Sequence, residues 1–362
     1  MECRSGLLDG VHSGTILLRL NCRLSIGGLG MLWWRLCWFS CLGSLILAVP
    51  VSSALAAPAP VPFMPDVDTW VVTSAGSHRA YQIWVARPDG YTRQHAPYPV
   101  LYVGDANAEF GIAVETAYLL SLAQQIPPVV VVGIGYPKPG HGFSASWVGR
   151  SLDFTPPIDK AQADRVLKDL MNDSKAYRYE TPTAVGGALE FLGFIREELI
   201  PSIQTRYNVS ASDRAWAGNS YGGLFGLYAL LNGDDPFKRF LIISPSIGFA
   251  DHVINRFEAD FASTHENLAA RVFLSTGDSG DIPVVDIQSF AAQLRSHEYS
   301  GLSLDVHIFE GENHTSGPPA AFSLGLRSIY SNVSKSGSNP IPDARHRQLR
   351  VASPPSETKR KL

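Results

Sequence analysis

The segment from Gly218 to Gly223 (Gly-Asn-Ser-Tyr-Gly-Gly) lies between two apolar runs of different kinds. The run before it, 214–217, is short and strand-like, whereas the run after it, 224–231, has the length of a helix. Small residues two positions before and two positions after a serine allow the backbone to close a sharp strand-to-helix turn. The pattern therefore predicts an α/β fold that exposes Ser220 on a nucleophile elbow.

The rest of the chain supports this fold class. Strand-like and helix-like segments alternate from about residue 98 to 333, which predicts a mainly parallel, doubly wound sheet with helices on both faces. Continuously apolar runs such as 98–103 and 129–134 are typical of strands that are covered on both faces. The region 137–185 has little readable pattern. We expect further strands at 69–73, 79–86, 240–244, 272–276 and 302–309, and helices at 191–207, 287–295 and 320–333.

The N-terminal region has the features of a secretory signal peptide. A short basic stretch starts at Met31, an apolar run covers 36–51, and Ala54-Leu55-Ala56 offers a cleavage site. We interpret Met31 as the true start and expect a secreted or periplasmic protein; an uncleaved segment would instead anchor the chain to a membrane. The expected organisation is an N-terminal extension plus signal peptide (1–57), a linker (58–67), an α/β-hydrolase domain (68–333) and a disordered tail (334–362).

Composition excludes several classes of function. A formal net charge of -3 gives no indication of nucleic-acid binding. All four cysteines lie within residues 1–57, so the remaining chain has no disulfide, thiol nucleophile or cysteine-ligated metal. It also has no metal-binding or phosphate-binding motif of a known kind. We therefore expect neither a metal nor a cofactor.

A nucleophilic serine needs a base, and the position of His314 suits that role. His314 lies in a short polar loop after the last expected strand, in the chain order serine, acid, histidine of α/β hydrolases. The acid should follow the preceding strand, where Asp278 and Asp281 are both candidates and Asp286 is a more distant one. We prefer Asp281 because it lies further from the strand end. Either aspartate could instead cap the next helix.

The oxyanion of the transition state needs two N–H donors. One is expected from Tyr221, directly after the serine, and the other from the loop after strand 98–103. The residues of that loop are Asp105, Ala106 and Asn107. The sequence does not distinguish which of its amides points inward, and Asp105 could equally serve only to form the turn.

Four segments together resemble a known family: residues 127–136, 150–156 (Arg-Ser-Leu-Asp-Phe-Thr-Pro), 191–201 and the elbow. They resemble the esterases related to esterase D over residues 68–330, and most of all the branch that hydrolyses ferric catecholate siderophores. The resemblance implies an α/β-hydrolase fold with Ser220 as nucleophile and His314 as base. The family's acid lies three residues after a glycine, whereas Asp281 lies four after Gly277, and some members use only a dyad.

The resemblance also gives the family's arginine a counterpart in Arg150. Its guanidinium could bind an anionic substrate or metal chelate, or could instead form a structural ion pair with Asp153. We therefore expect an exported serine esterase whose partner is a small-molecule ester, such as a ferric siderophore. The alternatives are an acyltransferase, a carbohydrate esterase that removes acetyl or feruloyl groups, and a non-enzymatic binding protein on the same fold.

Overall fold

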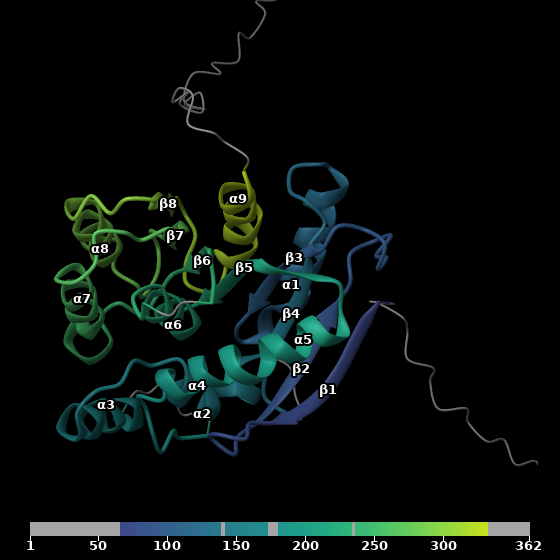
Figure 1. The fold of residues 1–362 in the computed structure, drawn as a ribbon. Helices are drawn as coiled ribbons and strands as arrows, with labels where there is room; N and C mark the ends of the chain where they lie inside the picture. Colours follow the sequence, from purple (N-terminus) through teal and green to yellow (C-terminus); the bar gives the residue numbers. More distant parts are fainter. Residues whose placement is uncertain (1–65, 139–141, 173–179, 234–235, 332–362) are drawn as a thin grey trace, which may run out of the picture. The chain divides into compact units, whose positions relative to one another are not determined.

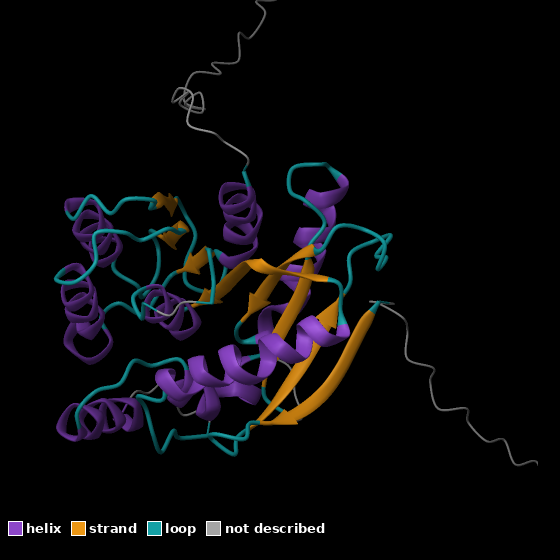
Figure 2. Cartoon of the chain, viewed as in Figure 1, coloured by secondary structure: helices purple, strands orange, loops and turns teal. Residues whose placement is uncertain are grey.

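Eight strands form one sheet in the computed structural model, in the order β1-β2-β4-β3-β5-β6-β7-β8 (Figures 1 and 2). The structure describes residues 66–138, 142–172, 180–233 and 236–331. The predicted signal peptide and C-terminal tail, and most of the predicted linker, lie outside these residues. The strands are β1 (Val67–Thr73), β2 (Ala80–Ala86), β3 (Tyr98–Val103), β4 (Val130–Gly135), β5 (Val209–Asn219), β6 (Arg239–Ile243), β7 (Arg271–Gly277) and β8 (Ser303–Phe309).

The direction of the strands determines where a site can form. β1, β2 and β4 pair antiparallel, and every pair from β4 to β8 is parallel. After β3 the chain adds β4 on one side of it, and it then returns to place β5 on the other side. A doubly wound sheet binds its ligands at such a switch point, outside the carboxyl ends of the strands. The loops that follow β3 and β5 are therefore the first place to look.

Helices cover both faces of the sheet (Figure 1). α1 and α9 pack together against one face, around a core that includes Phe110, Leu241 and Phe322. The opposite face carries a second core built around Phe191, Trp216 and Phe225. The helical segments are α1 (Ala106–Leu122), α2 (Phe143–Asp153), α3 (Lys160–Asn172), α4 (Ala188–Phe194), the π-helical turn η2 (Ile195–Leu199), α5 (Ile200–Arg206), α6 (Tyr221–Leu230), α7 (Phe249–Ala262), α8 (Val284–Ser296) and α9 (Pro318–Tyr330).

The expected doubly wound sheet is confirmed, and so is the position of each expected strand. The predicted helix 191–207 is a continuous helical run formed by α4, η2 and α5, starting at Ala188. Helices α1 and α7 were not predicted, and the poorly patterned region 137–185 contains α2 and α3. None of the helices in the described residues is both long enough and apolar enough to span a membrane.

Candidate active site

Ser220 lies between the end of β5 and the start of α6 with a strained backbone. Its φ and ψ are 59° and −119°, a conformation that a residue with a β-carbon rarely adopts. Hydrogen bonds fix this turn, because Ser220 N–H donates to Ile243 O on β6 (3.0 Å) and Ser220 O accepts from Ser246 N (3.2 Å). The Ser220 side chain is half-buried, and its hydroxyl lies 3.3 Å from Ser246 Oγ. The predicted strand–turn–helix geometry is present.

Two glycines of the motif are required by close backbone approach. A β-carbon on Gly218 would lie only 2.3 Å from Gly222 O, and one on Gly223 would lie 3.0 Å from Ile243 O. The same Gly222 carbonyl accepts a hydrogen bond from Trp216 Nε1 (3.0 Å), which ties the start of α6 to β5. Larger side chains here would push the first turn of α6 away from the strand and would move the serine.

The loop after β3 faces this turn. Gly104 N–H donates to Ala217 O on β5 (3.0 Å), so the ends of β3 and β5 are held side by side. Asp105 has a φ of 50° and starts α1. The amides of Ala106 and Asn107 are at the first positions of α1, and that of Tyr221 is at the first position of α6, where no acceptor exists within the helix. The amides that the sequence predicts as oxyanion donors therefore lie at two helix N-termini.

The Asn107 side chain has a different task. Its Oδ1 accepts from Tyr136 N (2.8 Å), and its Nδ2 donates to Tyr136 O (3.1 Å), just beyond β4. This pair of bonds fixes the first turn of α1 against the neighbouring strand. Of the Asn107 donors, only its main-chain N–H therefore remains a candidate for the oxyanion, beside the amides of Ala106 and Tyr221.

Arg150 is buried directly behind the serine. Its guanidinium donates from Nε to Asp105 Oδ1 (2.7 Å) and from Nη2 to Asp105 Oδ2 (2.9 Å), and more weakly from Nη2 to Asn219 O (3.4 Å). Arg150 is 2% exposed and Asp105 is fully buried. The expected alternative, an ion pair with Asp153, is wrong, because the guanidinium reaches across to the loop after β3 instead.

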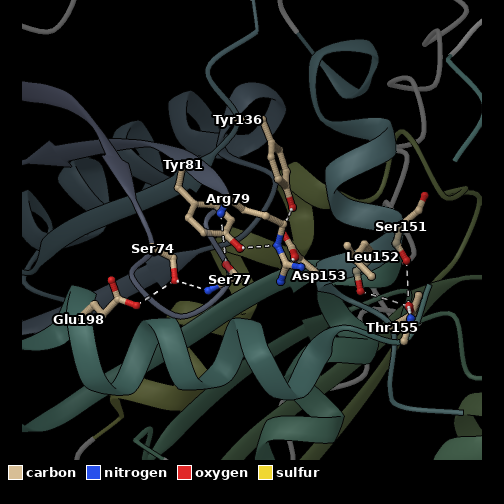
Figure 3. A network of polar contacts seen from close by, with 11 residues as sticks. Ser74, Ser77, Arg79, Tyr81, Tyr136, Ser151, Leu152, Asp153, Thr155 and Glu198 are labelled. Atoms are coloured by element: carbon tan, nitrogen blue, oxygen red, sulfur yellow. Dashed lines mark hydrogen bonds and ion pairs between the residues drawn. The ribbon is translucent and has the colours of Figure 1, made fainter. Parts of the chain in front are cut away.

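Asp153 belongs to a separate polar network at the end of α2 (Figure 3). It is fully buried, forms an ion pair with Arg79 Nη2 (2.8 Å) and accepts from Tyr136 Oη (2.9 Å). Burial raises the pKa of Asp153 to about 6, although Arg79 and the hydrogen bond from Tyr136 act in the opposite direction. Two residues on, Thr155 Oγ1 donates to Ser151 O and accepts from Gly186 N. In the family segment 150–156, Arg150 thus points to the site, whereas the other polar residues make structural contacts within the fold.

His314 lies in the loop between β8 and α9. Burial lowers the pKa of its imidazole; the positive charge of Arg150 lowers it further, and the carboxylate of Asp281 raises it. The neutral form that a general base needs is therefore favoured near neutral pH. His314 Nδ1 is buried and has no hydrogen-bond partner among the described residues. A direct hydrogen bond from Ser220 to His314 is likewise absent there, and such bonds often form only with substrate in place.

The two candidate acids occupy different positions. Asp278 Oδ1 accepts from Gly311 N (2.8 Å) and from Ser279 Oγ (2.9 Å), so this carboxylate shapes the start of the histidine loop. Asp281 is exposed and acts on the charge of His314. The more distant candidate Asp286 lies on α8, 3.3 Å from His252. The carboxylate of Asp281 thus acts on the charge of His314, whereas that of Asp278 makes a structural contact.

The loop after β7 packs tightly against the histidine loop. A β-carbon on Gly277 would lie 2.1 Å from Glu312 O, and one on Gly280 would lie 2.9 Å from His314 N. Ser279 N–H also donates to Glu312 O (3.0 Å). The position of His314 therefore depends on the absence of side chains at Gly277 and Gly280.

Several contacts of the site were not predicted from the sequence, although Tyr221 itself was expected there through its main-chain N–H. Tyr221, Trp147 and Phe249 form an aromatic cluster beside the serine: the first two stack at 6.3 Å, and Phe249 meets Tyr221 edge-on at 5.8 Å. The Arg150 guanidinium lies over the Tyr221 ring (5.1 Å). Ser246 and the buried Glu109 were also missed. Neither has a sequence motif: Ser246 contacts Ser220 from the loop after β6, and Glu109 lies on α1 near Asp105 and Arg150.

Other kinds of site have less support. Among the residues that the structure describes, no group of three histidine, cysteine or acidic side chains is arranged to hold a metal ion. A cavity of about 590 Å³ lies between the β1–β2 edge and α1, and its lining includes Arg87, Glu115 and Tyr118. None of the predicted site residues lines it.

Comparison with known proteins places this site in context. The sequence model of a family described as "Putative esterase" matches residues 74–317. The ferri-bacillibactin esterase BesA of Bacillus subtilis is 28% identical over 273 residues, which cover 73% of this chain and 89% of BesA. A siderophore enterobactin esterase of Emericella nidulans is 36% identical over 197 residues, 51% of this chain and 59% of that protein.

Solved structures agree with this result. The BES protein from Bacillus cereus has a TM-score of 0.62 and 28% identity, over 73% of this chain and 96% of its own. The siderophore hydrolase EstA from Aspergillus nidulans has a TM-score of 0.59 and 27% identity, over 75% of this chain and 96% of its own. With the mostly parallel sheet and the turn at Ser220, these matches show that the chain belongs to this esterase family and has the α/β-hydrolase fold.

Proposed function

We propose that this protein is a serine hydrolase of carboxylic esters that works through an acyl-enzyme. The observation that carries the proposal is the strained Ser220 turn, located at the switch point of the sheet between the starts of α1 and α6. Strain at a non-glycine residue persists only where the surrounding structure enforces it, and it concentrates at functional sites. Membership of an esterase family gives the reaction class.

Each step of the reaction has a group in this site. His314 takes the proton of Ser220 Oγ as the oxygen attacks the ester carbonyl, and the amides of Tyr221 and of Ala106 or Asn107 stabilise the oxyanion. His314 then gives the proton to the alcohol that leaves. Water attacks the acyl-enzyme with His314 again as base, and the acid and free Ser220 are regenerated. Asp281 stabilises the imidazolium in both halves of the reaction.

We propose a siderophore ester as the substrate class. The relatives named above act on siderophores by their descriptions, and the aromatic cluster of Tyr221, Trp147 and Phe249 offers a surface for an aromatic acyl group beside the serine. Activity on ferric enterobactin should therefore exceed activity on acetylated xylan and on simple aryl esters. Turnover of the simple aryl esters alone would contradict the substrate class but not the esterase assignment.

The Ser220→Ala variant tests the reaction itself. It should lose hydrolysis of p-nitrophenyl acetate and butyrate while its circular dichroism spectrum stays unchanged. Turnover equal to that of the wild type would refute Ser220 as the nucleophile. Product analysis with added alcohols separates a hydrolase from an acyltransferase, since only the latter forms a new ester as its main product.

We also propose that the protein is exported. The basic stretch, apolar run and Ala54-Leu55-Ala56 site support this, and they lie outside the described residues. Expression of the full chain in a bacterial host should yield a shorter protein in the periplasm or medium, with its new N-terminus next to Ala57. A full-length product in the cytoplasmic fraction would contradict the proposal.

A further inference from the structure

A second carboxyl group, that of Glu109, is buried beside the Arg150–Asp105 ion pair. Glu109 is on the first turn of α1 and is 2% exposed. Neither of its carboxyl oxygens has a hydrogen-bond partner among the described residues. Its polar neighbours are Asp105, Asn219 and Arg150. None of the reaction steps above uses this group.

The charges around Glu109 do not allow for a second anion. Asp105 already binds Arg150 through two hydrogen bonds and balances its charge. A carboxylate on Glu109 would be an uncompensated charge in a buried site, next to the charge of Asp105. An isolated buried carboxylate is strongly disfavoured and takes up a proton instead. Burial, with the charge of Asp105, raises the pKa of Glu109 to about 8, although the side chain of Asn219 and the charge of Arg150 act in the opposite direction.

The neighbouring amide supplies the second observation. Asn219 is 2% exposed, and its Oδ1 is also buried without a hydrogen-bond donor among the described residues. An ionised Glu109 has no proton to give this oxygen. A protonated Glu109 can donate its O–H to Asn219 Oδ1 and accept from Asn219 Nδ2, and both unsatisfied groups then gain a partner.

We propose that Glu109 is held as a neutral carboxylic acid that donates to Asn219 Oδ1 and thereby positions the turn that carries Ser220. Asn219 is the residue immediately before Ser220, and its carbonyl already accepts from Arg150 Nη2. The main chain and the side chain of Asn219 are thus held from two sides. Glu109 is a positioning residue, and its catalytic effect rests on the proposed role of Ser220.

The Glu109→Gln variant, compared with Glu115→Gln, tests the inference. Glutamine can donate to Asn219 at every pH, and Glu115 is an exposed acid on the same helix. The kcat/KM of the wild type for p-nitrophenyl butyrate should fall about tenfold from pH 7 to pH 9, as Glu109 ionises. The Glu109→Gln variant should keep its activity over this range, and Glu115→Gln should follow the wild type.

Two further measurements do not depend on catalysis. In urea unfolding, Glu109→Gln should gain stability over the wild type as the pH rises from 5 to 8, because stabilisation by the protonated acid is lost through that range. Infrared spectra of the wild type should show a carboxylic-acid carbonyl band that Glu109→Gln lacks. If Glu109→Gln does not fold, Glu109→Met replaces it: the band should be absent and activity should be low at every pH.

Parallel pH profiles of wild type and Glu109→Gln in both activity and unfolding would overturn the proposal, as would an infrared spectrum without the acid band. Failure of the proposed function would look different. Retained turnover in Ser220→Ala would remove Ser220 from the mechanism, while the unfolding and infrared results on Glu109 would still stand.

Discussion

Arg150 and Asp105 form a bidentate ion pair, with N–O distances of 2.7 and 2.9 Å, behind the predicted nucleophile. The pair joins α2 to the loop after β3, and the arginine extends it to the carbonyl of Asn219 at the end of β5. Neither side chain is accessible to water. In this arrangement Arg150 is part of the scaffold of the site, whereas the sequence left open whether it binds substrate or forms a structural ion pair.

Replacing one partner of this ion pair should destabilise the fold much more than replacing both partners together. Asp105→Asn and Arg150→Met should each lower the free energy of unfolding by about 3–5 kcal/mol, because each leaves one buried charge without a partner. The double variant should be more stable than either single variant, since no isolated charge remains. Urea unfolding of the four proteins gives this coupling energy directly. Additive losses would mean that the two groups do not stabilise each other.

The two candidate acids can be separated by the pH dependence of kcat/KM. Asp281 raises the pKa of His314, so Asp281→Asn should lower that pKa and move the acidic limb of the profile to lower pH. It should also reduce kcat, because the imidazolium loses its stabilising charge. Asp278→Asn removes the charge, keeps an oxygen that can accept from Gly311 N, and should leave the limb in place. If the acidic limb shifted in Asp278→Asn alone, Asp278 and not Asp281 would be the acid.

The contact between the loop after β7 and the histidine loop is a third test. In Gly280→Ala the new β-carbon lies 2.9 Å from His314 N, so the histidine must move. We expect kcat/KM to fall by roughly 10- to 100-fold, with little change in stability. Gly193→Ala on α4 is the control: its β-carbon meets no atom within 4 Å, so activity should be unchanged. Equal activity in both variants would show that the loop adapts.

The parts of this molecule that the sequence predicted are local ones. The Ser220 turn depends on a few consecutive residues, and the parallel strands are short apolar runs that stand out individually. Helix α1 was missed because apolar residues such as Leu119 and Leu122 also lie on its exposed side, so its buried positions do not stand out in the sequence. The mainly parallel pairing followed from the alternation of elements, since parallel strands need crossover connections.

The contacts that complete the site are not local. Asp105 and Arg150 are 45 positions apart, so no spacing rule pairs them; the only ion-pair partner that the sequence offered for Arg150 was the nearby Asp153. Glu109 looks like an ordinary helical acid until the fold brings it next to Asn219 and Arg150. The same applies to Ser246, which reaches Ser220 only through the loop after β6. Burial and tertiary approach decide the roles of these side chains.

Asp153 gives a pH-dependent test of the network in Figure 3. Its folded pKa of about 6 lies above the ordinary value of 3.8, so stabilisation by its protonated form is complete below 3.8 and is lost as the pH rises through 6. In urea unfolding, the free energy of unfolding of Asp153→Asn should therefore rise relative to that of the wild type by up to ~3 kcal/mol between pH 4 and pH 7.5. Asp89→Asn, at an exposed position, should show no such trend. A constant difference for Asp153→Asn would contradict the raised pKa.

The strain at Ser220 can be measured without any substrate. With φ at 59°, a residue without a β-carbon should relax the turn, so Ser220→Gly should be more stable than Ser220→Ala by about 1–2 kcal/mol. At an ordinary helical position such as Ser323 on α9, the order should be the opposite, because glycine is less favourable than alanine in a helix by about 1 kcal/mol. Urea unfolding of the four variants compares the two positions. If alanine is the more stable replacement at both, the turn at Ser220 stores no strain.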